Sequence, residues 1–171
     1  MQPIKRLMEV VSNLASPQAC LFALADLRSI LPEHSDAAFK TLLSRAVRER
    51  HLTRVCRGLY LYEKVNLDRG SLLAHAVAKL RPMGLNYLSL ETVLSDAGVI
   101  SQIPMNRIMV MSSGRSCVIE CGSWGSIEFV KTRQDPEDLV GQLTYDGKSR
   151  LWRASVKQAL RDMRACLLRL V

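Results

Sequence analysis

The chain has 171 residues, of which 48% are hydrophobic and 23% are charged, and its formal net charge is +8. This length accommodates one ordinary domain or two small ones with a hydrophobic core, and the composition excludes an intrinsically disordered chain. Because like charges that lie close together repel, a positive charge of this size favours a polyanionic partner, either nucleic acid or an acidic surface.

No apolar run in the sequence reaches the roughly 18 residues that a membrane-spanning helix needs, so we expect no association with a membrane. The N-terminal stretch MQPIKRLMEVVSNLASPQA begins with basic residues, but Glu9 and Asn13 interrupt its apolar positions. It therefore predicts a short amphipathic helix rather than a signal peptide, and the expected location of the protein is the cytoplasm.

The N-terminal part of the chain has the apolar periodicity of three short helices. Residues 4–14 predict the first, which Ser16-Pro17 closes, and the stretch FALADLRSILP predicts the second, which ends at Pro32. Ser35 stands at the N-cap of the third helix, which should end near Arg50 or His51. The apolar stripe of this third helix consists of Phe39, Leu42, Leu43, Ala46 and Val47.

A β-hairpin is predicted directly after these helices, in the stretch LTRVCRGLYLYE. Residues on both sides of Arg57-Gly58 favour strands, and this pair is itself a turn signal. Three helices followed by a hairpin is the order of a winged helix-turn-helix, in which the third helix enters the major groove and the hairpin contacts the DNA backbone. We therefore predict a winged-helix DNA-binding domain over residues 1–64.

Residues 65–171 predict a second, mixed α/β domain, so the fold class of the whole chain is α+β. Helices are expected at Leu72–Leu80 and at Leu88–Ala97, the latter stopped by Gly98, and strands in the runs RIMVMSS, SCVIECG and GSIEFVK. A last helix, from Ser155 to Leu170, carries an apolar stripe made of Val156, Leu160, Met163, Leu167 and Leu170.

The third helix is the strongest candidate for contact with DNA. If its apolar stripe faces the core, its outward face carries Lys40, Thr41, Ser44, Arg45 and Arg48. Small side chains permit close approach to the bases, and an arginine can bond a guanine in bidentate fashion or grip a phosphate. Arg54, Arg57 and the backbone at Gly58 would then meet the flanking phosphates.

An ordinary solvated helix face is the alternative interpretation, and Glu49 could pair with Arg45 four residues before it. Between Lys40 and Arg57, however, six Lys or Arg residues stand against one acidic residue, which favours DNA binding. Tyr60, in the second strand of the hairpin, could pack on the core or bond a phosphate oxygen.

Near the C-terminus a second basic stripe is formed by Arg153, Lys157, Arg161 and Arg164, at spacings of four, four and three. It could contact the DNA backbone and so extend the length of duplex that the protein covers. It could equally be a solvated face opposite the apolar stripe of the last helix.

The sequence contains no pattern that we can assign to catalysis, a metal or a cofactor. His34, His51 and His75 fall on different elements, and no Walker or dinucleotide-binding glycine motif is present. The cysteines include no CxxC pair, and Cys117 and Cys121, in one predicted strand, are expected to be buried free thiols. We therefore expect a protein that is not an enzyme and needs no cofactor.

Several stretches, in this order, resemble the AbiEi-type antitoxins, regulators encoded beside AbiE toxins in abortive-infection loci. FALADLRSILP and AFKTLLSRAVRERHLTRVCRGLY are similar to the family's N-terminal winged-helix segment, which ends here in Leu52, Arg54, Arg57, Gly58, Leu59 and Tyr60. The stretch NYLSLETVLSDAGVISQIP resembles a second family segment through Tyr87, Ser89, Leu90, Leu94, Gly98, Gln102 and Pro104. RASVKQALRDM is similar to a third through Ala154, Ser155, Ala159, Leu160 and Asp162.

This resemblance implies a type IV toxin–antitoxin role. Such proteins bind inverted repeats upstream of their own operon and repress it, and they counter a nucleotidyltransferase-type toxin without forming a stable complex with it. The matching positions of the DNA face would be Ser35, Lys40, Thr41, Ser44, Arg45, Arg48, Arg54, Arg57 and Gly58. The alternative is a protein-interaction module, whose basic helix and C-terminal domain bind an acidic partner or the toxin directly.

Overall fold

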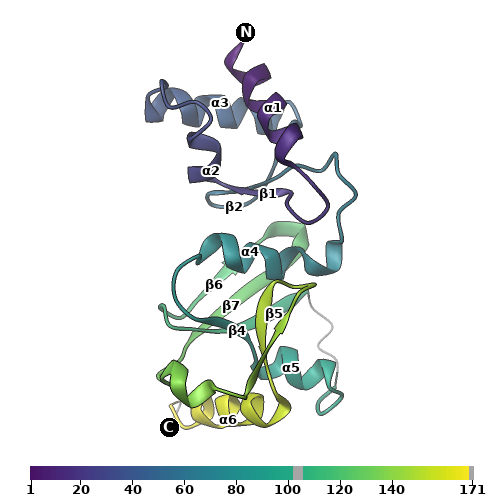
Figure 1. Ribbon diagram of the computed structural model, residues 1–171, viewed down its shortest axis with the longest axis vertical. Coiled ribbons are helices and arrows are strands. Elements are labelled where there is room, and N and C mark those ends of the chain that lie inside the picture. The colour runs from purple at the N-terminus through teal and green to yellow at the C-terminus, as the bar shows by residue number, and fades with distance from the viewer. Residues whose placement is uncertain (102–105, 170–171) are drawn as a thin grey trace. The chain divides into compact units, whose positions relative to one another are not determined.

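The computed structural model describes residues 1–101 and 106–169, and the chain divides into two compact units, Met1–Leu72 and Leu73–Val171 (Figure 1). Each unit contains both helices and strands, which confirms the predicted mixed α+β class. No helix within the described ranges is long and apolar enough to cross a membrane. Gln102, Pro104 and Leu170, which figure in the sequence predictions, lie outside the described residues.

The first unit combines three helices with a small antiparallel sheet. The helices are α1 (Pro3–Leu14), α2 (Leu24–Arg28) and α3 (Asp36–Arg48), and the strands are β1 (Leu21–Ala23), β2 (Thr53–Cys56) and β3 (Leu59–Leu61). The central strand is β3, which pairs antiparallel with both β1 and β2. The predicted first helix, third helix and hairpin are all present.

The second helix is shorter than predicted. Residues 21–23 form a strand that pairs with β3, so α2 begins only at Leu24 and ends at Arg28. Apolar spacing within the segment could not show this, because the partner strand lies almost forty residues further along the chain. The third helix also ends earlier than predicted, at Arg48 instead of near Arg50 or His51.

The apolar stripes of α1 and α3 belong to a single core. It includes Ile4, Leu7 and Val11 from α1, Phe39, Leu43 and Ala46 from α3, and Leu27, Leu31 and Leu52. As predicted, Ser35 caps α3, since its Oγ accepts a hydrogen bond from the backbone N–H of Ala38 at 3.2 Å. Because the stripe of α3 is buried on this side, its cationic side faces solvent.

The second unit is built on a six-stranded mixed sheet. Its strands are β4 (Asn86–Leu88), β5 (Arg107–Ser112), β6 (Cys117–Glu120), β7 (Ser126–Lys131), β8 (Leu143–Asp146) and β9 (Leu151–Ala154). Their order is β6-β7-β5-β4-β9-β8. The β4–β9 and β5–β7 pairs are parallel, and the other three pairs are antiparallel.

Three α-helices accompany this sheet: α4 (Leu72–Leu80), α5 (Leu90–Asp96) and α6 (Val156–Leu167). Short 3-10 helices occur at η1 (Arg69–Ser71), η2 (Gly122–Trp124) and η3 (Pro136–Leu139). Figure 1 shows α4 on one side of the sheet and α5 with α6 on the other. The two faces of the sheet are therefore covered by different helices.

Half of the strands of this sheet were predicted. The three predicted runs correspond to β5, β6 and β7, whereas β4, β8 and β9 were missed. The missed strands have only three or four residues. In addition, β4 and β9 pair with each other although they lie far apart in the chain. Leu88, the predicted start of a helix, instead ends β4, and Gly98, with a φ of 70°, follows α5 as predicted.

The last helix lies with its apolar stripe turned away from the core. Gln158, Ala159 and Asp162 are its buried residues. By contrast, Val156, Leu160 and Leu167 are 38%, 48% and 57% exposed. The basic positions of α6 face solvent, as the solvated-face alternative expects, but the predicted apolar stripe is itself largely exposed, with Met163 half-buried.

Candidate nucleic-acid interface

The predicted DNA-contacting residues of α3 are all exposed: Ser35, Lys40, Thr41, Ser44, Arg45 and Arg48. The hydroxyls of Thr41 and Ser44 donate to the carbonyls of Ala37 and Lys40, each at 3.0 Å. Their protons are thus engaged within the helix, while their oxygen lone pairs face outward. These two side chains can accept hydrogen bonds from a ligand and leave room for close approach.

The cations of this face divide into a paired and an unpaired group. Arg45 donates from Nε to Oε1 of Glu49 at 2.7 Å, the i,i+4 pair that the sequence suggested. This hydrogen bond lowers the pKa of the Glu49 carboxyl from its usual value. Within the described residues the side chains of Lys40 and Arg48 make no ion pair, so their charges are available to a partner.

The hairpin contributes two more exposed cations, Arg54 on β2 and Arg57 at its turn. Gly58, beside Arg57, has a φ of 77°, and an added Cβ would meet no atom within 4 Å. The glycine is therefore required for its backbone conformation and not for space. Its carbonyl accepts from the backbone N–H of Leu24 at 2.9 Å, which ties the turn to the start of α2.

Tyr60 and Tyr62 follow in and after β3. Tyr62 is buried, and Tyr60, which lies opposite Arg54 in the β2–β3 register, is half-buried against the core. Of the two roles that the sequence left open for Tyr60, the structure shows packing on the core, and Tyr62 belongs to the same core.

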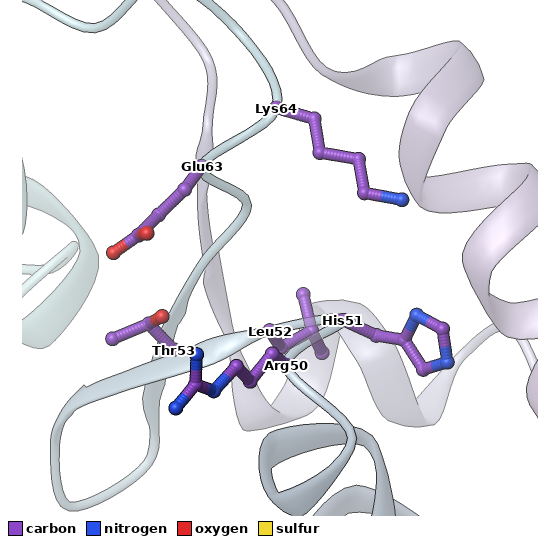
Figure 2. Close-up of a pocket in the computed structure, with 6 residues that line it drawn as sticks. All are labelled: Arg50, His51, Leu52, Thr53, Glu63 and Lys64. Atoms are coloured by element: carbon purple, nitrogen blue, oxygen red, sulfur yellow. The ribbon is translucent and has the colours of Figure 1, made fainter.

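A cavity of about 310 Å³ lies at the end of α3, lined by Arg50, His51, Leu52, Thr53, Glu63 and Lys64. Figure 2 shows His51 and Lys64 on one side of it, and Glu63, Thr53 and Arg50 on the other. Arg50 has a φ of 59°, a left-handed conformation in which glycine or asparagine is usually found. Sequence reasoning counted Arg50 as one of the basic residues but could not place Glu63 and Lys64 beside it.

The second basic stripe is only partly a feature of α6. On α6, Lys157, Arg161 and Arg164 are exposed, and they lie on the side of the helix next to its apolar stripe. Arg153 belongs to β9 instead, and it donates to Oδ2 of Asp96 at 2.6 Å. Three cations therefore remain as the candidate second contact with a polyanion.

Sequence reasoning missed a buried polar cluster around Asp162. This carboxylate, which is fully buried, accepts hydrogen bonds from the following donors: Tyr87 Oη (3.3 Å), Ser89 Oγ (2.6 Å), Gln134 Nε2 (3.0 Å) and Gln158 Nε2 (2.9 Å). Burial raises the pKa of Asp162 above its usual value, although the hydrogen bonds oppose this shift. The cluster turns α6 so that its polar side, not its apolar stripe, meets the sheet.

No group of three or more His, Cys, Asp or Glu side chains suited to a metal ion occurs in residues 1–101 and 106–169. The expectation that Cys117 and Cys121 are both buried is wrong for Cys117, which is exposed on β6, and correct for Cys121. No family model, curated protein or solved structure matches this chain, so its function must be inferred from its own residues.

Proposed function

We propose that the protein is a sequence-specific DNA-binding regulator whose first unit is a winged helix-turn-helix. The observation that carries the proposal is the exposed, cation-rich face of α3 and the hairpin, where Lys40, Arg48, Arg54 and Arg57 make no ion pair within the described residues. The order of elements α1-β1-α2-α3-β2-β3 and a sheet with β3 at its centre support it.

In this proposal α3 enters the major groove. Arg45 and Arg48 reach base edges or phosphates, and the short side chains of Thr41 and Ser44 let the helix approach closely. Arg54 and Arg57 neutralise phosphates beside the groove, and Lys40 adds a further contact near the helix start. Ser35 acts mainly through its cap, which sets where α3 begins.

The biological role that fits the resemblance is repression of its own operon and antitoxin activity against a nucleotidyltransferase-type toxin. The target would be double-stranded DNA with inverted repeats upstream of that operon. This part of the proposal rests on the resemblance, while the cationic face supports DNA binding alone.

The test is a fluorescence titration of the purified protein on its own upstream DNA and on scrambled DNA of equal length, at two salt concentrations. A preference of roughly a thousandfold or more at the higher salt would establish a specific regulator. Equal and steeply salt-sensitive binding to both duplexes would contradict it, because phosphate contacts alone do not distinguish sequences.

The apolar stripe of α6 favours a second candidate function, binding of an acidic protein partner. Leu160 and Leu167 are about half exposed, and the basic residues Lys157, Arg161 and Arg164 border them on the helix. A second copy of the chain would bring these cations against one another, so an acidic amphipathic segment is the complementary occupant.

A DNA-free pull-down with the product of the neighbouring gene tests this second function. Binding that is lost in Leu160→Asp, and kept in the matched exposed variant Leu14→Asp of α1, would support docking on α6. Failure of that product to bind the unmodified protein, or equal binding by Leu160→Asp, would contradict docking of that product on α6.

A further inference from the structure

A second cavity, of about 230 Å³, lies within the second unit, and its lining includes two aromatic side chains and two arginines. Tyr145 and Trp152 come from the β8–β9 hairpin, Arg150 from its turn, and Arg81 from the end of α4. None of the residues that line the cavity is acidic. Its lining thus combines an aromatic pair with the exposed cation Arg150, and the proposed contact of α3 with duplex DNA does not use it.

The two aromatic residues are unusually open for their size. Tyr145 is 52% exposed and Trp152 is 46% exposed, although they face each other directly in the β8–β9 register. Their ring centroids are 5.6 Å apart and the ring planes meet at 71°, an edge-to-face pair. Because the rings are not stacked on each other, a flat ligand can lie against a free ring face.

The side chains of the two arginines that line the cavity lie in different places. Arg81 donates from Nη1 to Ser112 Oγ at 2.8 Å, and its guanidinium lies 3.9 Å from the centroid of the Phe129 ring. Its Nη2 also donates to the carbonyl of Arg115 and to Sγ of Cys117 at 3.3 Å, so the charge is held at β5, β6 and β7, away from the aromatic pair on β8 and β9. Arg150 is exposed and makes no side-chain hydrogen bond or ion pair within the described residues, so it can reach a ligand.

The turn that carries Arg150 is held by hydrogen bonds within the turn and to α4. The carbonyl of Asp146 accepts from the backbone N–H of Arg150 at 2.8 Å, and its carboxylate accepts from that of Lys148 at 3.0 Å. The carbonyl of Lys148 also meets Nε2 of His75 on α4 at 2.9 Å. Arg150 itself has a φ of 56°, where glycine would be less strained, so the chain carries an arginine side chain at a conformational cost.

The geometry points to a binding site for a nucleotide whose base is not paired: the base stacks on Trp152 or Tyr145, and its phosphate is bound by Arg150. Aromatic side chains next to arginines are the chemistry by which proteins hold unpaired bases, each stack contributing about 1–3 kcal/mol. The ligand is either a free nucleotide or an unpaired nucleotide in a single strand. A base pair within a duplex keeps its ring faces covered and does not fit.

Trp152 supplies a direct readout, because the chain contains only one other tryptophan, Trp124. In a Trp124→Phe background, the fluorescence of Trp152 is titrated with adenosine monophosphate, a short single-stranded oligodeoxynucleotide and the corresponding duplex. The background also carries Arg54→Gln and Arg57→Gln, which weaken duplex binding by the first unit. Saturable quenching is expected with the nucleotide or the single strand, and not with the duplex.

The outcomes separate the two sources of the ligand. Quenching by the monophosphate assigns a free nucleotide, and quenching by the oligonucleotide alone assigns a single strand. No quenching by either, or equal quenching by duplex, overturns the inference. None of these results bears on the specific duplex binding proposed for α3, which is measured separately on the upstream DNA.

Variants test the individual contacts by anisotropy of a labelled ligand. Arg150→Gln should weaken binding about tenfold, and Trp152→Leu should weaken it by roughly 5- to 150-fold, whereas Trp152→Phe retains a ring and much of the affinity. Arg133→Gln removes an exposed charge from the same unit outside the cavity and should leave the affinity unchanged. Equal weakening by Arg150→Gln and Arg133→Gln would show nonspecific attraction and overturn the site.

Discussion

At the scale of single residues, the exposed cations of the first unit have different electrostatic surroundings. Arg45 shares its charge with Glu49, while Arg54 and Arg57 on the hairpin have no acidic partner within the described residues. A phosphate that approaches the hairpin therefore meets undiminished charge, whereas one that approaches Arg45 must compete with a carboxylate. We expect the hairpin to supply affinity that does not depend on sequence, and α3 to supply specificity.

Neutralising the hairpin cations tests this division of roles. Arg54→Gln or Arg57→Gln should weaken binding to upstream and scrambled DNA alike and should reduce the slope of log K against log salt by about one unit each. Arg48→Gln should instead reduce the preference for upstream DNA if Arg48 bonds a base. Titrations at several salt concentrations measure both quantities, and an unchanged slope in the hairpin variants would contradict phosphate contact.

Asp162 gives the second unit a pH-dependent stability. Burial raises the pKa of its carboxyl in the folded state above the usual value of 3.8, so the folded state binds this proton more tightly than the unfolded state does. The resulting contribution of Asp162 to the free energy of unfolding is fully present below the usual pKa, and it is lost as pH rises through the raised pKa. Asp162→Asn removes this titration and leaves the other ionisable groups in place, so the free energy of unfolding of the unmodified protein should fall relative to that of the variant as pH rises through this window.

Asp162→Asn also has an effect on stability that does not depend on pH. Its amide N–H groups would face side chains that donate to the carboxylate, among them Ser89 and Gln158, so some polar groups would lose their partners. Asp162→Asn should lower the free energy of unfolding by about 1–3 kcal/mol at neutral pH. Urea denaturation of the unmodified protein and of Asp162→Asn across pH 4–7 measures both effects. If the free energies of unfolding of the two proteins differ by the same amount at every pH, the titration of Asp162 is contradicted.

At the scale of elements, the orientation of α6 shows how a polar cluster can override an apolar pattern. Its spacing of Val156, Leu160 and Leu167 is that of a core-facing stripe, yet these side chains are exposed. Turning the stripe inward would move Asp162 away from its hydrogen-bond donors on β4 and on the chain after β7. Since the donors would lose their partner in the core, the polar side of the helix remains inside.

This orientation of α6 predicts that substitutions at two neighbouring positions change the stability of the protein by very different amounts. Leu160→Ser should change the free energy of unfolding by less than about 0.5 kcal/mol beyond its small helix-propensity cost, because the side chain is half exposed. Ala159→Leu should lower it by about 1–3 kcal/mol, because Ala159 is fully buried and a larger side chain would overfill the core. Thermal or urea unfolding measures the loss of stability in each variant. A larger loss in Leu160→Ser than in Ala159→Leu would contradict this orientation of α6.

At the scale of the whole molecule, the net charge of +8 acts on any polyanion before contacts form. Long-range attraction does not distinguish sequences, whereas the base contacts that we propose for α3 would. We therefore expect the association rate constants for upstream and scrambled DNA to be similar and to fall alike with salt, and the dissociation rate constants to carry the preference. Stopped-flow measurements test this, and a preference in association alone would contradict it.

Local patterns predicted much of the first unit. The periodicity of α1 and α3, the Ser35 cap and the turn at Gly58 each depend on residues close in sequence, and all are present. The same was true of β5, β6 and β7, whose β-rich runs are separated by glycine and serine turns. The exposed cations of α3 followed from the helix phase, since burying one side of a helix fixes what the other presents.

Pairings between distant segments decided the rest. β1, β4 and the β8–β9 hairpin are too short to show a pattern, and each exists because a partner strand completes its backbone hydrogen bonds. The cavity with Trp152 and Arg81 joins a hairpin to a helix seventy residues earlier in the chain, which no spacing rule detects. The sequence by itself determined composition, charge, helix phase and turns, because these depend on neighbours along the chain. Only the tertiary structure decided which side of α6 is buried and which arginines lie beside aromatic rings, because these depend on contacts between residues far apart in sequence.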